Sequence, residues 1–220
     1  MSERPRIKIC GLTRNEDARL AEGLGADFLG LVLSEGFGRS VPRDLAASVV
    51  AGIRASTVAV LVDEPASTAA DLARRIGASV IQLHGDERVE EVEELRRLGA
   101  WRLWKAVRAD TVDDLRRMVD RFGRAVDGFL VEGWREGVVG GGGVALRLEP
   151  TVVRGMIPSE CDFVLAGGLT PESVGGAVAR FGPDVVDVSS GVERSARVKD
   201  SGLVKSFIEA ARLASFSPEA

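Results

Sequence analysis

Short apolar runs alternate along the chain with longer stretches in which apolar residues recur at helical spacing. The apolar runs lie at residues 6–10, 28–33, 58–62, 80–83, 101–107, 126–131, 163–166 and 184–188. Stretches of helical length follow them at about 15–24, 43–53, 67–76, 88–98, 111–122, near 150, from 170 and at 203–213. A helix between two strands returns the chain to the same edge of a sheet, so this alternation predicts parallel strands.

Eight strand–helix units in 220 residues predict an α/β fold, a closed (β/α)8 barrel. We expect residues 1–220 to form a single domain, because no linker or shift in composition divides them. The alternative is an open doubly wound sheet, but the chain lacks the Gly-x-Gly-x-x-Gly turn that would follow its first strand in a dinucleotide-binding protein. A barrel places functional residues at the C-terminal ends of its strands.

Two consecutive strand ends consist of small residues. Gly167 and Gly168 follow the seventh apolar run, and Ser189, Ser190 and Gly191 follow the eighth. Glycine lets the backbone approach a ligand closely, and free N–H groups favour an anion. A glycine pair alone would equally serve a tight turn, but a second small-residue end beside it favours ligand binding. We therefore expect these five residues to bind the phosphate of a phosphorylated small molecule.

Composition limits the possible partners. The formal net charge is −4, and basic and acidic residues are interspersed, so no electrostatic footprint for nucleic acid or an anionic membrane is present. The two cysteines are far apart and lack metal-site spacing, which fits a reducing compartment. Without a leader or an apolar run of membrane-spanning length, we expect a soluble cytoplasmic protein.

Cys10 is the first candidate for chemistry. Alternation along the first strand puts Lys8 and Cys10 on one face and Ile7 and Ile9 on the other. If the isoleucines face the helices, Cys10 points into the top of the barrel, where a thiolate could act as a base or nucleophile. The alternative is a small buried hydrophobic residue. Cys161 begins the seventh strand and is expected to be structural, at the opposite rim.

Glu132 and His84 are the next candidates. Glu132 ends the sixth apolar run, and partial desolvation there would favour its neutral form, which suits a general acid. The alternative for Glu132 is a solvated loop carboxylate. His84 is the only histidine, so it cannot build a multi-histidine metal site, and it is either structural or part of the site. We expect no metal.

Further polar and aromatic residues could orient a substrate. Arg39, after the second strand, could bind a carboxylate bidentately or be a surface arginine. Phe37 and Trp134 could flank an aromatic ring or pack under a loop. Lys8 and Asp187 point inward from the first and eighth strands, which become neighbours on closure, so we expect a buried ion pair.

Four segments together resemble the phosphoribosylanthranilate isomerase family: residues 8–13, 82–85, 165–172 and 187–193. The resemblance implies a (β/α)8 fold and an Amadori rearrangement without metal or organic cofactor. In that reaction a general acid protonates the furanose ring oxygen, the ring opens to a Schiff base, and a general base removes the C2 proton. The resemblance implies that Cys10 is the base and that Glu132 stands where the family has an aspartate acid. We also expect Lys8, Arg39, His84 and Asp187 to bind or orient the substrate.

Three positions depart from the family pattern, all at the sugar or anthranilate end of the site. Glu132 is one methylene longer than aspartate, which moves the carboxyl by roughly 1.5 Å. Residues 37–39 read Phe-Gly-Arg in place of Ser-Pro-Arg, and residues 140–143 are all glycine in place of Gly-Gly-Thr-Gly. Two alternatives therefore stay open.

The first alternative is a paralogue that isomerises or epimerises a different phosphosugar or amino-sugar phosphate. The second is a non-catalytic barrel that binds a phosphorylated ligand, although mere binding needs neither an inward thiol nor a carboxyl. The expected partner is a small phosphorylated molecule in each case. The sequence leaves the oligomeric state open between a monomer and a homodimer.

Overall fold

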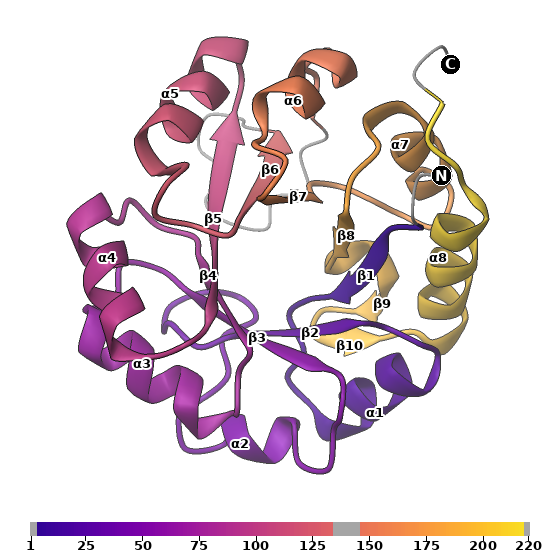
Figure 1. Cartoon of the computed structure of the whole chain (residues 1–220). Helices are drawn as coiled ribbons and strands as arrows, with labels where there is room; N and C mark the ends of the chain where they lie inside the picture. Colours follow the sequence, from indigo (N-terminus) through magenta and orange to yellow (C-terminus); the bar gives the residue numbers. More distant parts are fainter. Residues whose placement is uncertain (1–3, 134–145, 218–220) are drawn as a thin grey trace.

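The computed structural model describes residues 4–133 and 146–217, and eight parallel strands close into a barrel (Figure 1). The strands pair in chain order, and the eighth pairs with the first. They are β1 (Arg6–Ile9), β2 (Phe28–Val32), β3 (Ser56–Leu61), β4 (Val80–Leu83), β5 (Arg102–Ala109), β6 (Gly128–Gly133), β7 (Asp162–Leu165) and β8 (Val185–Val188). Closure confirms the predicted (β/α)8 fold and excludes the open doubly wound sheet.

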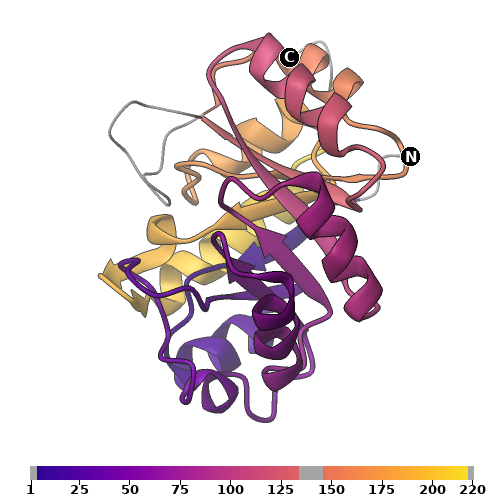
Figure 2. The same cartoon turned by 90° about the vertical axis from the view of Figure 1, so that its left-hand side faces the viewer.

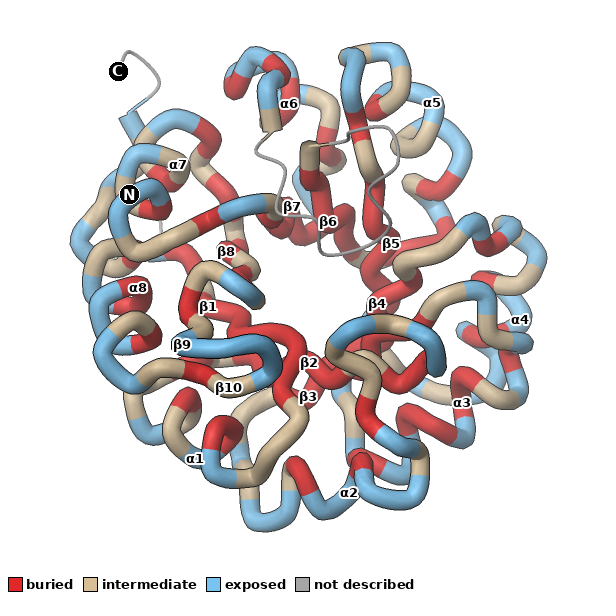
Figure 3. Tube along the Cα trace, turned by 180° about the vertical axis from the view of Figure 1, so that it is seen from behind, coloured by how far each residue is buried: buried red, intermediate tan, exposed pale blue. Residues whose placement is uncertain are grey.

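Helices surround the barrel (Figures 1 and 2). They are α1 (Asn15–Gly23), α2 (Ala46–Val49), α3 (Ala66–Arg75), α4 (Val89–Leu98), α5 (Val112–Phe122), α6 (Pro150–Met156), α7 (Val174–Phe181) and α8 (Ser201–Leu213). Buried residues follow the strands, and exposed residues lie on the outer helices and the loops (Figure 3). None of the described helices has the length and apolar character needed to cross a membrane. That residues 1–220 form a single domain stays a prediction.

Alternation along β1 separates two layers of core. Ile7 and Ile9 belong to the layer between strands and helices, whereas Cys10 belongs to the inner cluster with apolar side chains from each of the other strands. Lys8 is fully buried and is the register partner of Asp187 on β8. The predicted register, with the Lys8 and Cys10 side chains inside the barrel, is confirmed.

The helix predicted at residues 43–53 is wrong in length, because α2 has four residues. The N–H of Leu45 donates to the carbonyl of Pro42 at 2.9 Å, and the N–H of Ser48 donates to that of Leu45 at 3.0 Å. These bonds span three residues, as in 3₁₀ turns, which wind more tightly than an α-helix. Apolar spacing indicates a helical segment but does not distinguish these two windings.

The sequence analysis did not predict the hairpin that follows β8. After β8 the chain forms a 3₁₀ turn, η1 (Ser190–Val192), and then two antiparallel strands, β9 (Glu193–Ser195) and β10 (Val198–Lys199). The segment is mostly polar and shows no alternation, and Arg197 between the strands has a left-handed φ of 68°. The hairpin matters for function because it carries Glu193 and Lys199 to the rim of the barrel.

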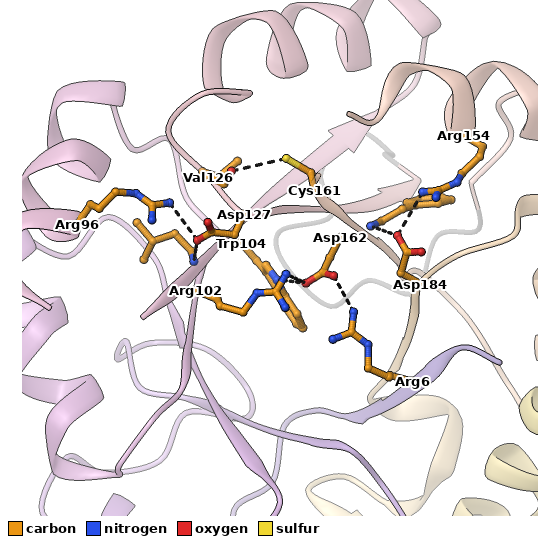
Figure 4. A network of polar contacts seen from close by, with 12 residues as sticks. Arg6, Arg96, Arg102, Trp104, Val126, Asp127, Arg154, Cys161, Asp162 and Asp184 are labelled. Carbon is orange, nitrogen blue, oxygen red and sulfur yellow. Dashed lines mark hydrogen bonds and ion pairs between the residues drawn. The ribbon is translucent and has the colours of Figure 1, made fainter. Parts of the chain in front are cut away.

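Aspartates organise the N-terminal rim of the barrel. Asp27, Asp127 and Asp184 each stand just before a strand and accept, at 2.8 Å, the N–H of the second residue of the preceding strand. The sulfur of Cys161 lies at the same rim, 3.6 Å from the carbonyl of Val126 (Figure 4). Cys161 is thus placed at the predicted end, opposite Cys10.

Asp162 is the most heavily bonded member of this rim (Figure 4). Its carboxylate lies 2.6 Å from the guanidinium groups of both Arg6 and Arg102 and accepts the indole N–H of Trp104 at 3.0 Å. Trp104 is fully buried, so loss of its acceptor would leave a donor without water. The cluster is therefore expected to stabilise the fold without taking part in chemistry.

Asp162→Ala is expected to lower the free energy of unfolding by about 2 kcal/mol, chiefly because the Trp104 N–H loses its partner. Urea denaturation measures the change. Asp71→Ala, which removes an exposed pair with Arg74, is the matched control and should stay within about 0.5 kcal/mol of the wild type. Equal losses in the two variants would contradict a structural role for the buried cluster.

Candidate active site

A pocket opens at the C-terminal ends of the strands, and the predicted site residues meet there. Its lining includes Cys10, Arg39, His84, Glu132, Asp187, Gly167, Gly168, Ser189, Ser190 and Gly191. Lys8 alone of the predicted set lies beneath the pocket, fully buried. Phe37 also lines the pocket, and that it flanks an aromatic ring stays a prediction. The predicted contributions of Trp134 and of residues 140–143 lie outside the described residues.

Cys10 lies above an ion pair between the fully buried Lys8 and the partly buried Asp187. The Nζ atom of Lys8 is 2.9 Å from Oδ1 of Asp187, which confirms the predicted pair. Burial raises the pKa of the Cys10 thiol, the charge of Lys8 opposes this, and the pKa stays above its ordinary value of 9.0. The free protein therefore holds a thiol, and the predicted thiolate is not the resting state. Burial also acts to lower the pKa of Lys8, but Asp187 and Cys10 outweigh it and the ammonium stays charged.

Glycine at position 30 makes room for this arrangement. Gly30 lies on β2, beside β1, and a Cβ atom there would stand 2.8 Å from the sulfur of Cys10 and 3.2 Å from Cε of Lys8. A Cβ atom essentially never lies within 3.0 Å of another heavy atom, so a side chain at this position would displace the thiol. The sequence alone does not indicate this requirement, because it depends on the register between two strands.

Glu132 is buried at the end of β6, which excludes the solvated loop carboxylate. Its Oε1 atom lies 3.2 Å from Nε2 of His84 and 3.3 Å from Nε of Arg108. Burial acts to raise the pKa of Glu132, but the hydrogen bonds from His84 and Arg108 and the positive charge of Arg108 outweigh it, and the pKa lies below its ordinary value of 4.5. The expectation that desolvation keeps this carboxyl neutral is therefore wrong.

The two groups that hold Glu132 ionised come from neighbouring strands. Arg108 on β5 is the register partner of Glu132 on β6, and its Nη2 also donates to the carbonyl of His84 at 3.2 Å. On its other side, Nδ1 of His84 lies 2.9 Å from Nε2 of Gln82. Sequence reasoning missed the roles of Arg108 and Gln82, because the partners of an inward side chain depend on the strand register.

A buried ion pair supports the loop after β4. Nζ of Lys105 donates to Oε2 of Glu87 at 2.9 Å and to the carbonyl of Gly85 at 2.7 Å. The other oxygen of Glu87 accepts the N–H of Gly85 at 2.9 Å. Both charged side chains are buried, and together they fix the main chain directly after His84. This pair was also missed, since Lys105 lies within an otherwise apolar run.

Arg39 forms a bidentate clamp, and the carboxylate it holds belongs to the chain itself. Its Nε and Nη2 atoms donate to the two oxygens of Glu193 at 2.8 and 2.7 Å. Lys199 donates to Glu193 at 3.0 Å and to the carbonyl of Ser189 at 2.9 Å. Burial would raise the pKa of Glu193, but Arg39 and Lys199 outweigh it and lower the pKa. Arg39 is therefore no free surface arginine, and one edge of its guanidinium group is occupied.

The small-residue ends of β7 and β8 form one side of the pocket. Gly167 and Gly168 have left-handed φ values of 92° and 62°, and in the part of the chain that the structure describes their amides donate to no protein acceptor. A Cβ atom on Gly191 would stand 2.0 Å from the carbonyl oxygen of Leu169, so the two loops touch. This arrangement offers free N–H groups beside Cys10 and Glu132, as an anion site requires.

Comparisons with known proteins confirm the predicted family. A family model for N-(5'-phosphoribosyl)anthranilate (PRA) isomerase matches residues 7–210. The isomerase of that name from Rubrobacter xylanophilus is 36% identical over 212 residues, which cover 94% of this chain and 98% of the relative. The one from Moorella thermoacetica is 37% identical over 211 residues, or 95% and 90% of the two chains.

Solved structures of this family have the same fold. Phosphoribosyl anthranilate isomerase from Thermotoga maritima superposes with a TM-score of 0.82 at 29% identity, over 94% of this chain and 98% of that one. Another isomerase structure, in complex with reduced 1-(o-carboxyphenylamino)-1-deoxyribulose 5-phosphate, gives 0.80 at 28% identity over the same shares. The chain described here therefore belongs to the N-(5'-phosphoribosyl)anthranilate isomerase family.

Proposed function

We propose that this protein isomerises N-(5-phosphoribosyl)anthranilate to 1-(2-carboxyphenylamino)-1-deoxyribulose 5-phosphate, an Amadori rearrangement in tryptophan biosynthesis. The observation that carries the proposal is the meeting of a thiol, a carboxyl and two small-residue loops in one pocket of a chain from this family. As part of the same proposal, the protein acts in the cytoplasm as a monomer or homodimer. Turnover of the purified protein, followed by loss of substrate fluorescence, tests it.

Two side chains perform the proposed proton transfers. Glu132 gives its proton to the furanose ring oxygen as the bond from that oxygen to C1 breaks, which leaves a protonated Schiff base. Cys10 then takes the proton from C2, and the electrons of the C–H bond neutralise the Schiff base to give an enolamine. Tautomerisation of the enolamine yields the aminoketose. Lys8, beneath Cys10, stabilises the thiolate on which the second step depends.

Other residues bind the substrate in this proposal. The phosphate lies between the amides after β7 and β8, near Gly168 and Ser190. Arg39 uses one guanidinium edge for Glu193, and the edge that includes Nη1 binds the anthranilate carboxylate. Phe37 packs on the aromatic ring. A paralogue with another substrate stays the second candidate, because Glu132 and residues 37–39 depart from the family pattern at this end.

The protonation states predict a broad pH profile. The active form needs a proton on Glu132 and none on Cys10, the reverse of the resting state, but both forms carry the same number of protons. Their ratio is therefore constant between the two pKa values, and kcat/KM should be flat between pH 4.5 and pH 9.0, because the pKa of Glu132 is lowered from the first value and that of Cys10 is raised from the second. Activity falls below this range because Cys10 keeps its proton, and above it because Glu132 has none to give. A limb near neutral pH, other than that of the substrate phosphate with its second pKa of about 6, would contradict these assignments.

Gly168→Ala is expected to raise KM about tenfold, because a methyl group would fill the phosphate site and the left-handed backbone would be strained. Gly77→Ala is the matched control: Gly77 has a φ of 60°, close to the 62° of Gly168, but no heavy atom lies near its missing side chain. Both variants place a Cβ atom on a left-handed backbone of nearly the same φ. An equal KM in the two variants would contradict phosphate binding at Gly168.

A further inference from the structure

Gln82, His84 and Glu132 form a line of hydrogen bonds along the wall of the pocket. Nε2 of Gln82 lies 2.9 Å from Nδ1 of His84, and Nε2 of His84 lies 3.2 Å from Oε1 of Glu132. Gln82 is 1% exposed, so water does not compete for these bonds. We infer that Gln82 is a positioning residue: it holds His84 in the tautomer that is protonated on Nε2 and thereby directs that N–H at Glu132.

The chemistry of the three groups supports this tautomer. An ionised carboxylate only accepts hydrogen bonds, so the ring nitrogen that faces Glu132 must be a donor. In a neutral imidazole the other nitrogen, Nδ1, then carries the lone pair. The amide nitrogen of Gln82 donates to this lone pair, whereas its carbonyl oxygen in the same place would repel it. The amide of Gln82 and the ring of His84 therefore fix each other's orientation.

The hydrogen bond to His84 is the interaction that orients the side-chain amide of Gln82. Oε1 of Gln82 is buried and has no hydrogen-bond partner among the described residues, so nothing there holds the oxygen end. The main chain of His84 is held in turn, because Arg108 donates to its carbonyl at 3.2 Å. The held backbone of His84 and the two side-chain hydrogen bonds of its ring together leave the ring one position, with Nε2 toward Glu132.

The consequence for catalysis rests on the proposed role of Glu132 as the acid. A neutral N–H lowers the pKa of a neighbouring carboxyl less than a positive charge does, and Arg108 already supplies one charge at 3.3 Å. A neutral His84 with its Nε2–H directed at Glu132 favours the ionised carboxylate less strongly than a charged ring would. Glu132 is then protonated more often, and a protonated Glu132 is what the first step requires.

Nitrogen NMR of protein labelled with ¹⁵N-histidine tests the inference directly, since the chain has one histidine and its signals need no assignment. At neutral pH the wild type should show one protonated nitrogen, Nε2, and one unprotonated nitrogen, Nδ1. A ring with two protons, or with its proton on Nδ1, would overturn the inference. The wild-type spectrum tests the tautomer of His84 even if the variants fail to fold.

Two variants test what the amide donor of Gln82 contributes: one replaces it with a charged acceptor, and the other removes it. Gln82→Glu has the same shape but offers an acceptor, so both ring nitrogens should be protonated at neutral pH and kcat should fall about tenfold or more. Gln82→Met, the matched control, offers neither donor nor acceptor; the ring should stay neutral, and the Nδ1 signal should move to that of a free imine nitrogen. An Nδ1 signal at the same chemical shift in Gln82→Met and in the wild type would contradict the inference.

These readouts distinguish the inference from the proposed function. The histidine spectra require no turnover, so a protein that shows the expected tautomer but does not isomerise phosphoribosylanthranilate contradicts the function alone. A protein that isomerises this substrate with a doubly protonated His84 contradicts the role of Gln82 alone.

Discussion

Cys10→Ala is expected to lower kcat for the isomerisation by a factor of about 10³, within the range observed when a general base is removed. Asp187, which also lines the pocket, is paired with Lys8 at 2.9 Å and is a weaker base than a thiolate, so we expect it not to take over the proton transfer. Affinity for a reduced product analogue should change little, because the thiol contributes little to binding the phosphate or the carboxylate. Steady-state kinetics and titration of the analogue measure the two effects.

Cys161→Ala is the matched control for this experiment. Cys161 is also buried, but it lies at the opposite rim against Val126, away from the pocket. Its replacement should leave kcat unchanged and cost only some stability. If Cys10→Ala kept most of the wild-type turnover, Cys10 would be the small buried hydrophobic residue of the alternative interpretation, and another base would have to be found.

Glu132→Gln is expected to lower kcat by a factor of about 10² or more, because the amide has no acidic proton to give to the ring oxygen. The amide keeps the size of the side chain and can still accept a hydrogen bond from His84. Binding of a product analogue should therefore stay close to that of the wild type. Unchanged turnover in this variant would show that Glu132 is not the acid.

Glu132→Asp separates the two candidate substrates. If the protein isomerises phosphoribosylanthranilate with a longer acid than its relatives, the shorter side chain should retain or improve activity. If the wild type is inactive on this substrate and Glu132→Asp creates activity, the longer carboxyl serves a different phosphorylated sugar, and the paralogue is the correct interpretation. The variant also lengthens the gap to His84 and Arg108, so its pH profile should change with it.

The barrel was predictable because each strand and helix leaves a local pattern. Runs such as 80–83 coincide with β4, and alternation along β1 was enough to place Cys10 inside. Local patterns were insufficient where the structure is irregular. The turns around α2 have helical spacing without a long helix. The β9–β10 hairpin is mostly polar and is held by Glu193, which pairs with Lys199 and with Arg39 of the loop after β2, so local apolar alternation does not mark it.

The positions of the site residues were predictable, but their protonation states were not. Topology gathers strand ends at one rim, so Cys10, Glu132 and the two small-residue loops were expected to meet. The pKa of Glu132 depends on His84 and Arg108, which approach it from other strands at distances that only the strand register determines. For the same reason Gln82 and Glu193 were recognised only as parts of motifs, and not as partners of His84 and Arg39.

Turnover of phosphoribosylanthranilate by the purified wild-type protein tests the central claim most directly. The substrate is generated in the cuvette, and its fluorescence is followed after the protein is added, with Cys10→Ala as the blank. The proposed function predicts a fluorescence loss that is proportional to wild-type protein and nearly absent with the variant. A loss no faster than with Cys10→Ala, from protein whose barrel is folded, would contradict it.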